Sequence, residues 1–223
     1  MWRPDLETVF DGEWMYLSQP LNEYILQSDY ISHSSVVSIS SKPDNGNGVY
    51  WYSYDYGLVH TIMISTEHDL SSKSEQYQWL LQDLSSVNRT LTPWVIIEGH
   101  RPMYMIEDLP TETVVGVDLR KNIETLLKTY NVDLFLGGHY HSYFRSCSGL
   151  YKNKCDNGGL THITIGTAGA QLDWAPLLRR SWGRFYSAEW GYGRITVANS
   201  TALHFEFVSD KDGSTRDSVW LRR

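Results

Sequence analysis

The sequence predicts an α/β fold, because apolar runs that suit buried strands alternate with segments of helical periodicity. Residues 93–100, "PWVIIEGH", and 132–141, "VDLFLGGHYH", are continuous apolar runs of the kind found in strands buried on both faces of a sheet. Between them, residues 118–131 repeat apolar residues at helical spacing. Strand, helix and strand in this order predict a layered sheet whose polar site lies beyond the carboxyl ends of its strands.

Length and charge narrow the class of protein. At 223 residues the chain is long enough to bury one sizeable core. Its net charge of −7 argues against a polyanion-binding surface, so we expect no nucleic-acid partner. No apolar run approaches the roughly 18 residues of a transmembrane helix, so we expect no membrane span.

The first 48 residues differ in pattern from the rest. Residues 32–48, "SHSSVVSISSKPDNGNG", are rich in Ser, Gly, Asn and Asp, which is typical of loop or weakly held strand. We therefore divide the chain into a poorly defined amino-terminal segment, residues 1–48, and a main region, residues 49–223. The main region opens with "VYWYSYDYG" (49–57) and "VHTIMIST" (59–66), which predict two strands of a sheet.

Two helices are predicted in the main region. The first lies at residues 74–87 with Ser74 as its N-cap, and the second at residues 118–131 with Asp118 as its N-cap. Their apolar faces are formed by residues three or four apart: Tyr77, Leu80, Leu81 and Leu84 in the first, and Ile123, Leu126, Leu127 and Tyr130 in the second. After them, short β-rich segments predict a closing antiparallel sheet, at residues 161–169, 193–200, 202–210 and 218–223.

The two cysteines and the two glycosylation sequons indicate the cellular compartment of the protein. Cys147 and Cys155 flank a segment rich in Ser, Gly, Asn and Lys, so a short disulfide-closed loop is geometrically easy and would need an oxidising compartment. The glycosylation sequons at Asn88 and Asn199 point the same way. We expect a secreted protein, or one of an endolysosomal or vacuolar lumen. Residues 1–16 show no signal-peptide pattern, so we also expect a missing amino-terminal portion.

Three histidines stand where predicted strands end. His100 follows "WVIIEG", and His139 and His141 follow "VDLFLGG". Glycine before His100 and before His139 lets the backbone turn sharply and approach a ligand closely. His139 and His141 are two residues apart, so in an extended chain both point to one side and could serve one metal site or two adjacent ions. We predict that these three imidazoles are metal ligands.

The other histidines lack this context. An isolated histidine is usually a structural or surface group. This interpretation applies to His33, His60, His68, His162 and His204. His68 follows a strand and is also a candidate to support the metal ligands from outside.

Arginine pairs and aromatic residues have ordinary interpretations as well. The arginines at 179–180 and 222–223 are interpreted as solvated surface rather than as a phosphate clamp. The nine tryptophans and fifteen tyrosines are scattered, which favours packing within the core. A carbohydrate-binding module that stacks sugars on these rings is the alternative.

Four stretches carry a family resemblance: "WYSYDYGLVHTIMISTEHDL", "SEQYQWLLQDLSSVNRTLTPWVIIEGHRPMY", "VDLFLGGHYHSYFRSC" and "HITIGTAGAQ". Together they resemble the carboxy-terminal part of the purple acid phosphatases, within the calcineurin-like metallophosphoesterases. The resemblance runs from about Gly48 to Trp220. It implies a partial metallophosphoesterase fold, an α/β sandwich of two sheets flanked by helices that lacks its amino-terminal βαβ half.

The resemblance also implies an activity and its cofactors. Members of this family hydrolyse phosphate monoesters, best at acidic pH, with a two-metal centre of Fe(III) together with Zn, Mn or Fe(II). By position, His100 and His139 match ligands of the divalent metal, and His141 matches a ligand of the ferric ion. Two adjacent cations polarise the ester and stabilise its attacking and leaving oxygens. We therefore expect a metal-dependent acid phosphatase with a phosphate monoester as substrate.

The sequence departs from the family in its earlier motifs. Patterns that resemble Gly-Asp-x-Gly, Gly-Asp-x-x-Tyr and Gly-Asn-His-Glu, which supply further metal ligands and a catalytic histidine, do not occur here. No catalytic residue is therefore assigned. Three imidazoles without a bridging carboxylate are a short ligand set, so we expect at most about one weakly bound divalent ion. The alternative is a noncatalytic relative that serves as a binding or interaction protein. Without the first βαβ half we also expect an exposed sheet edge, which invites association.

Overall fold

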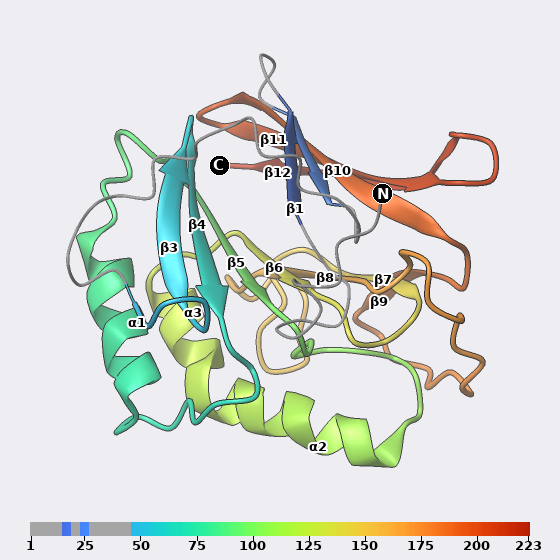
Figure 1. Ribbon diagram of the computed structural model, residues 1–223, viewed down its shortest axis with the longest axis horizontal. Coiled ribbons are helices and arrows are strands. Elements are labelled where there is room, and N and C mark those ends of the chain that lie inside the picture. Colours follow the sequence, from blue (N-terminus) through green and yellow to red (C-terminus); the bar gives the residue numbers. More distant parts are fainter. Residues whose placement is uncertain (1–14, 19–22, 27–45) are drawn as a thin grey trace.

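Two β-sheets pack face to face, and helices cover one outer face (Figure 1). In this computed structural model the described residues are 15–18, 23–26 and 46–223. The larger sheet has the strand order β3 (Tyr52–Tyr56), β4 (Val59–Ile64), β5 (Trp94–Gly99), β6 (Leu134–Gly137), β8 (Thr161–Ile165), β7 (Tyr143–Ser146), β9 (Gly183–Ser187). The smaller sheet has the order β1 (Met15–Ser18), β2 (Glu23–Leu26), β10 (Gly191–Asn199), β11 (Ala202–Ser209), β12 (Thr215–Arg222).

The larger sheet has a parallel centre. Strands β4, β5, β6 and β8 run parallel, whereas β3 pairs antiparallel with β4 and β7 pairs antiparallel with β8 and β9. Successive residues of β5 face opposite sides, because Val95 and Ile97 join the core under the helices while Ile96 joins the core between the sheets. The continuous apolar run therefore predicted a strand buried on both faces correctly.

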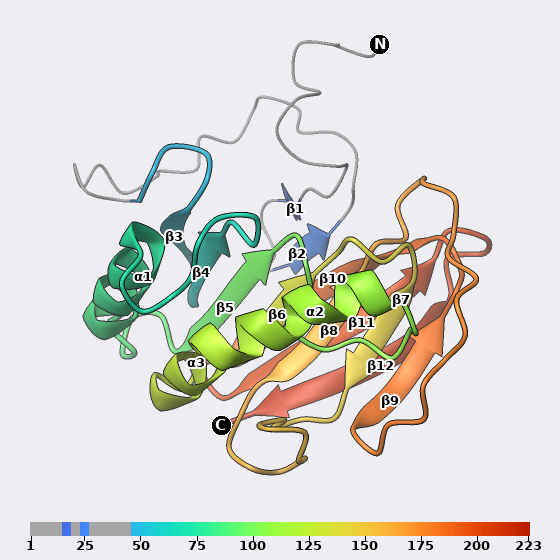
Figure 2. The ribbon, with the colours of Figure 1, turned by 90° about the horizontal axis from the view of Figure 1, so that it is seen from below.

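Helix α1 (Glu75–Ser86) links β4 to β5 and begins where it was predicted. The Ser74 hydroxyl accepts a hydrogen bond from the backbone N–H of Tyr77 at 3.1 Å, which satisfies a donor of the first turn. Leu80 and Leu84 are buried beneath it. Figure 2 shows α1, α2 (Pro110–Leu119) and α3 (Thr125–Thr129) over the same face of the larger sheet.

The second helix begins earlier than predicted. It starts at Pro110, so Asp118 lies inside the helix and the prediction that it caps the helix is wrong. Proline suits the first helical position because no N–H is needed there. Leu109 precedes it without a side-chain cap, and residues 111–117 are rich in Thr and Val, which are weak helix formers. A π-helical turn, Arg120–Glu124, joins α2 to α3.

The carboxy-terminal strands are only partly as predicted. Strands β10, β11 and β12 form the expected antiparallel arrangement. Strand β8 was expected in the same sheet, but it pairs in parallel with β6 in the larger sheet. A short alternating segment indicates a strand but does not indicate which strand it pairs with. The path of the chain through the fold determines that neighbour.

A shared carboxylate joins the two sheets across their common core. Tyr143 of β7 stacks on Phe207 of β11 with ring centroids 4.1 Å apart. The Tyr143 hydroxyl donates to Asp217 of β12 at 2.7 Å, and Arg145 donates to both oxygens of the same carboxylate at 2.6 and 2.8 Å. Asp217 is buried, so this contact holds one strand of each sheet in a fixed relation.

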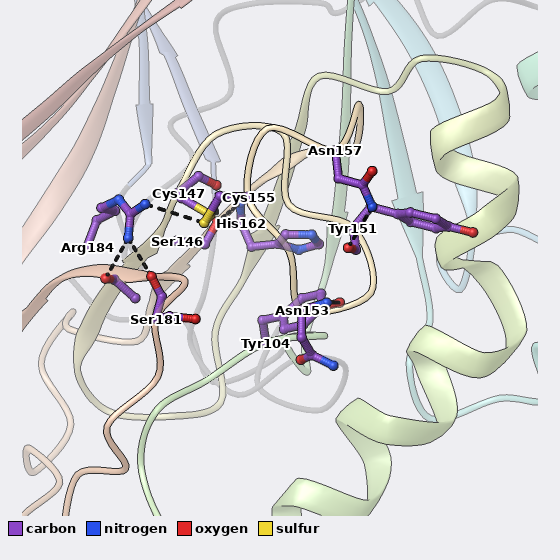
Figure 3. Close-up of a disulfide and its surroundings, with 11 residues drawn as sticks. Tyr104, Ser146, Cys147, Tyr151, Asn153, Cys155, Asn157, His162, Ser181 and Arg184 are labelled. Atoms are coloured by element: carbon purple, nitrogen blue, oxygen red, sulfur yellow. Dashed lines mark hydrogen bonds between the residues drawn. A yellow bond between two sulfur atoms is a disulfide. The ribbon is translucent and has the colours of Figure 1, made fainter.

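The predicted disulfide between Cys147 and Cys155 is present (Figure 3). It closes the loop that follows β7, with the two Cα atoms 5.8 Å apart. The loop is also held from outside, because the N–H of Asn153 donates to the Tyr104 hydroxyl at 3.3 Å. The sequon residues Asn88 and Asn199 are both exposed: Asn88 lies in the loop after α1, and Asn199 is the last residue of β10. Among the described residues, no helix is long and apolar enough to cross a membrane.

Candidate metal centre

Two of the three predicted ligands meet at the carboxyl edge of the parallel strands. Gly99, the last residue of β5, pairs with Gly137, the last residue of β6. His100 and His139 follow these strand ends, and Nδ1 of His139 lies 3.0 Å from Nε2 of His100. Their rings meet edge to face with centroids 4.9 Å apart. The site therefore arises because adjacent parallel strands end at the same level.

Close backbone packing sets this geometry. A Cβ added at Gly137 would lie 3.1 Å from Cα of Pro102, so the turn after β5 packs directly against the end of β6. The N–H of Gly138 donates to the carbonyl of His100 at 2.8 Å. His139 has a φ of 66°, in the left-handed region that few residues other than glycine occupy. Such conformations cluster at functional sites, where the surrounding structure sustains their cost.

Arg101 fixes the protonation pattern of the pair. Its Nη1 lies 3.1 Å from Nε2 of His139, and its Nε donates to Glu67 at 2.7 Å. A guanidinium only donates, so Nε2 of His139 is the acceptor. In the neutral ring the proton is then on Nδ1, which donates to Nε2 of His100. The lone pair that His139 would offer to a metal is therefore turned toward a cationic side chain.

His141 has a separate set of contacts. Its Nδ1 lies 2.8 Å from the carbonyl oxygen of Gln171, and its backbone N–H donates to Asp173 at 2.7 Å. Because a carbonyl only accepts, Nδ1 carries the proton and Nε2 keeps the lone pair. An Nδ1–H bonded to a carbonyl is the usual arrangement that orients a metal-ligating imidazole. His141 thus has the tautomer that a ligand needs.

A buried acidic group lies behind His141. Glu107 accepts a hydrogen bond from the hydroxyl of Ser142. Burial raises the pKa of Glu107, and the nearby charge of Asp173 adds to this effect. Burial and the charge of Glu107 raise the pKa of Tyr186 to about 12. This group places negative charge near His141 and keeps Tyr186 protonated.

The described donor set does not fit a two-metal centre. Across residues 15–18, 23–26 and 46–223, no three or more His, Cys, Asp or Glu side chains are grouped closely enough to hold one metal ion. His100 and His139 form a pair of imidazoles, whereas a pair of metal ions needs carboxylates to balance its charge. The guanidinium of Arg101 adds positive charge at the same place. The described part thus offers two ligands for one ion, with His141 oriented for ligation apart from them.

The other histidines have contacts that suit structural roles. His60 is buried between two carboxylates, with Nδ1 2.6 Å from Asp55 and Nε2 2.9 Å from Asp83. His204 stacks on Trp220 with ring centroids 4.3 Å apart.

His68 and His162 complete the described set. His68 is exposed, and its Nδ1 lies 2.7 Å from the Ser65 hydroxyl. Among the described residues no contact joins it to a predicted metal ligand, so its proposed supporting role stays a prediction. His162 is buried without a hydrogen-bond partner for either ring nitrogen among the described residues, and burial lowers its pKa to about 3. His33 lies outside the described residues.

Sequence reasoning missed three residues that shape the site. Arg101 stands in the same "GHRP" string as His100, but nothing in the string indicates that its guanidinium reaches His139. Gln171 and Asp173 contact His141 from a loop about 30 residues away. The sequence of that loop shows neither helical nor strand periodicity. Only the path of the loop in the fold brings Gln171 and Asp173 to His141.

Sequence models of two families match this chain. The one described as "Calcineurin-like phosphoesterase" matches residues 10–143. The one described as "Iron/zinc purple acid phosphatase-like protein C" matches residues 159–218. The first match ends just after the candidate histidines, and the second covers β8 and most of the smaller sheet.

Comparison with individual proteins also shows similarity to purple acid phosphatases. The chain is 36% identical over 183 residues to probable inactive purple acid phosphatase 9 of Arabidopsis thaliana, a match that covers 76% of this chain and 28% of that protein. It is 35% identical over 212 residues to acid phosphatase type 7 of Homo sapiens, covering 82% and 48%. The structure of purple acid phosphatase PPD1 from yellow lupin seeds matches with a TM-score of 0.72 at 29% identity, covering 78% and 32%. The chain spans less than half the length of each of these proteins.

Proposed function

This chain belongs to the calcineurin-like phosphoesterase family and is of the purple acid phosphatase type. From that premise we propose that it serves the hydrolysis of phosphate monoesters. The single observation that carries this proposal is the contact between His100 and His139 at the carboxyl edge of β5 and β6. Two imidazoles brought together from separate strands suit one divalent cation.

Each histidine has a role in this proposal. His100 and His139 hold a divalent ion, Zn, Mn or Fe(II), and His141 contributes to a second, ferric site through Nε2. The described residues do not complete a two-metal centre, so no step of the reaction is assigned to a metal here. The disulfide Cys147–Cys155 supports an oxidising compartment, which agrees with secretion or a lumenal location.

A second function, binding without catalysis, is favoured by one contact. The guanidinium of Arg101 lies 3.1 Å from the nitrogen that His139 would offer to a metal, so an ion has to displace it. Two relatives of this chain are themselves named probable inactive purple acid phosphatases. Under this second proposal the scaffold is kept for interaction with a partner, and the histidines bind metal weakly or not at all.

Elemental analysis together with a phosphatase assay distinguishes the two proposals. The purified chain is incubated with Fe(III) and Zn²⁺, desalted, and assayed with p-nitrophenyl phosphate at acidic pH beside a purple acid phosphatase of known activity. Metal-dependent turnover that is lost in His139→Ala and kept in His204→Ala supports hydrolysis. A folded chain that retains about one metal ion or fewer and has no turnover supports the noncatalytic alternative.

A further inference from the structure

A cavity of about 570 Å³ lies beside the candidate metal centre but is not formed by its histidines. Its walls come from the turn after β5, the carboxyl end of α2, Tyr140 and the segment that leads into β9. The volume falls within the range of small-molecule sites. Tyr140 stands between His139 and His141 in the sequence, so the cavity adjoins that edge of the sheet while none of the three imidazoles lines it.

Three arginines line this cavity, and none of the other lining residues that the structure describes is acidic. Arg120 enters from the start of the π-helical turn, and Arg179 and Arg180 enter from the segment before β9. Neither Arg179 nor Arg180 forms an ion pair in the part of the chain that the structure describes. These two arginines were expected to be ordinary solvated surface. Their convergence with Arg120 on one cavity concentrates positive charge there.

The segment that carries Arg179 and Arg180 is anchored on both sides. The N–H of Leu178 donates to the carbonyl of Ile106 at 2.7 Å, and the N–H of Cys147 donates to the carbonyl of Trp182 at 2.7 Å. The Trp182 ring is buried and packs edge to face on Tyr104, with centroids 5.2 Å apart. The two arginines are therefore presented from a fixed stretch of backbone.

Arg120 is held in place at the wall of the cavity. It donates to the carbonyl of Met103, and its guanidinium lies 4.6 Å from the centroid of the Tyr104 ring. Burial lowers the pKa of Arg120, and the positive charge of Arg180 adds to this effect, although the carboxylate of Glu124 opposes it. That carboxylate is not among the described lining residues, and it accepts hydrogen bonds from the Tyr104 hydroxyl and from the N–H of Lys152. An anion in the cavity would relieve the repulsion between Arg120 and Arg180.

The rest of the lining indicates what kind of anion fits. Met103, Met105 and Trp182 supply apolar and aromatic surface, and Asn153 and Ser181 supply polar side chains. Arginine forms paired hydrogen bonds to phosphate-type oxygens and stacks on flat rings. A π-helical turn, as at Arg120, is frequently found at functional sites. We propose that this cavity binds a small organic phosphate or phosphonate whose charged group meets Arg120 and Arg180 and whose apolar body packs on Met103 and Trp182.

Phenylphosphonate tests this proposal, because it combines the anion with an aromatic ring and has no ester to hydrolyse. It is titrated calorimetrically into the full chain in EDTA, so that a metal held by the histidines does not bind it. We expect binding by the wild-type chain, about tenfold weaker binding in Arg180→Ser and in Arg120→Gln, and unchanged binding in His139→Ala. Arg222→Ser, which removes an exposed charge from β12, is the matched control.

The outcomes of this titration can be distinguished from those of the metal-binding and phosphatase experiments. Inorganic phosphate titrated alone should bind more weakly than phenylphosphonate, and equal affinities would overturn the part of the proposal that concerns the apolar body. No binding to the folded wild-type chain, or equal binding by wild type and Arg180→Ser, would overturn the site as a whole. Arg180 is exposed, so Arg180→Ser decides the matter even where Arg120→Gln alters folding, which circular dichroism checks.

Discussion

Nδ1 of His139 lies 3.0 Å from Nε2 of His100, although 39 residues separate the two in the sequence. The contact exists because β5 and β6 are adjacent parallel strands that end at paired glycines. Arg101 extends it, so that guanidinium, imidazole and imidazole form one chain of hydrogen bonds. Any cation bound by this pair must compete with that chain.

Replacing Arg101 tests this competition. We predict that Arg101→Met raises the affinity for Zn²⁺ by roughly tenfold, because it removes a positive charge and frees the lone pair of His139 Nε2. Zn²⁺ binding is measured by competition with a chromophoric chelator. Arg222→Met, which changes an exposed arginine on β12, serves as the control. An affinity in Arg101→Met equal to or below that of wild type would show that the guanidinium does not compete with the metal.

The sequence pattern predicted the central strands of the larger sheet. It failed to predict the structure where pairing between distant strands determines the sheet. The run at 93–100 needed only its own apolar character to be identified as β5, because both faces of that strand are buried. Strand β8 was assigned to the wrong sheet, because its alternating residues carry no information on whether β6 or β12 is its neighbour. The start of α2 was missed because its first turn has a proline and no polar cap.

The site was predictable to a similar degree. His100 and His139 were predicted to be metal ligands because each follows glycine at the end of an apolar strand. The structure brings the two rings together, and their binding of a metal stays a prediction. The contact of His141 with Asp173 was not predictable, because it depends on how the loop after β8 returns to the sheet. Arg180 was taken as surface for the same reason, since a pair of arginines in a loop has no pattern that marks a cavity.

The carboxylate shared between the sheets should be important for stability. We predict that Asp217→Asn lowers the free energy of unfolding by about 3 kcal/mol, because it leaves the half-buried guanidinium of Arg145 without its partner. Urea denaturation followed by tryptophan fluorescence measures the change. Asp210→Asn, at an exposed position in the turn after β11, should change stability by less than about 0.5 kcal/mol. Equal effects of the two substitutions would show that the bridge is dispensable.

His60 should make stability fall as pH rises above neutrality. Burial alone lowers the pKa of His60, but the hydrogen bonds and charges of Asp83 and Asp55 outweigh it, so the folded-state pKa is raised above 6.5. The resulting stabilisation is fully present below pH 6.5 and is lost as pH rises through the folded-state pKa. In His60→Gln the unfolding free energy should fall less steeply from pH 6 to pH 9. A slope identical to wild type would mean that His60 has no raised pKa.

His162 should have the opposite effect at acidic pH. Burial lowers its pKa to about 3, so the unfolded chain takes up a proton near pH 6.5 that the folded chain does not. Lowering the pH from 6.5 to 5 should therefore cost the wild-type chain about 2 kcal/mol through this residue. His162→Leu, which packs apolar atoms against Tyr104 and Phe135, should remove this loss. The prediction fails if thermal unfolding of the two proteins depends equally on pH between 5 and 6.5.

The most direct test of the central claim, that His100 and His139 hold one divalent ion together, is Co²⁺ binding followed by its visible absorption. We predict that His100→Ala and His139→Ala each abolish the d–d bands of the wild-type complex, that the double variant is no weaker than either single one, and that His204→Ala keeps the bands unchanged. Wild-type bands in His139→Ala would contradict the account, because the ion would then have to be bound elsewhere.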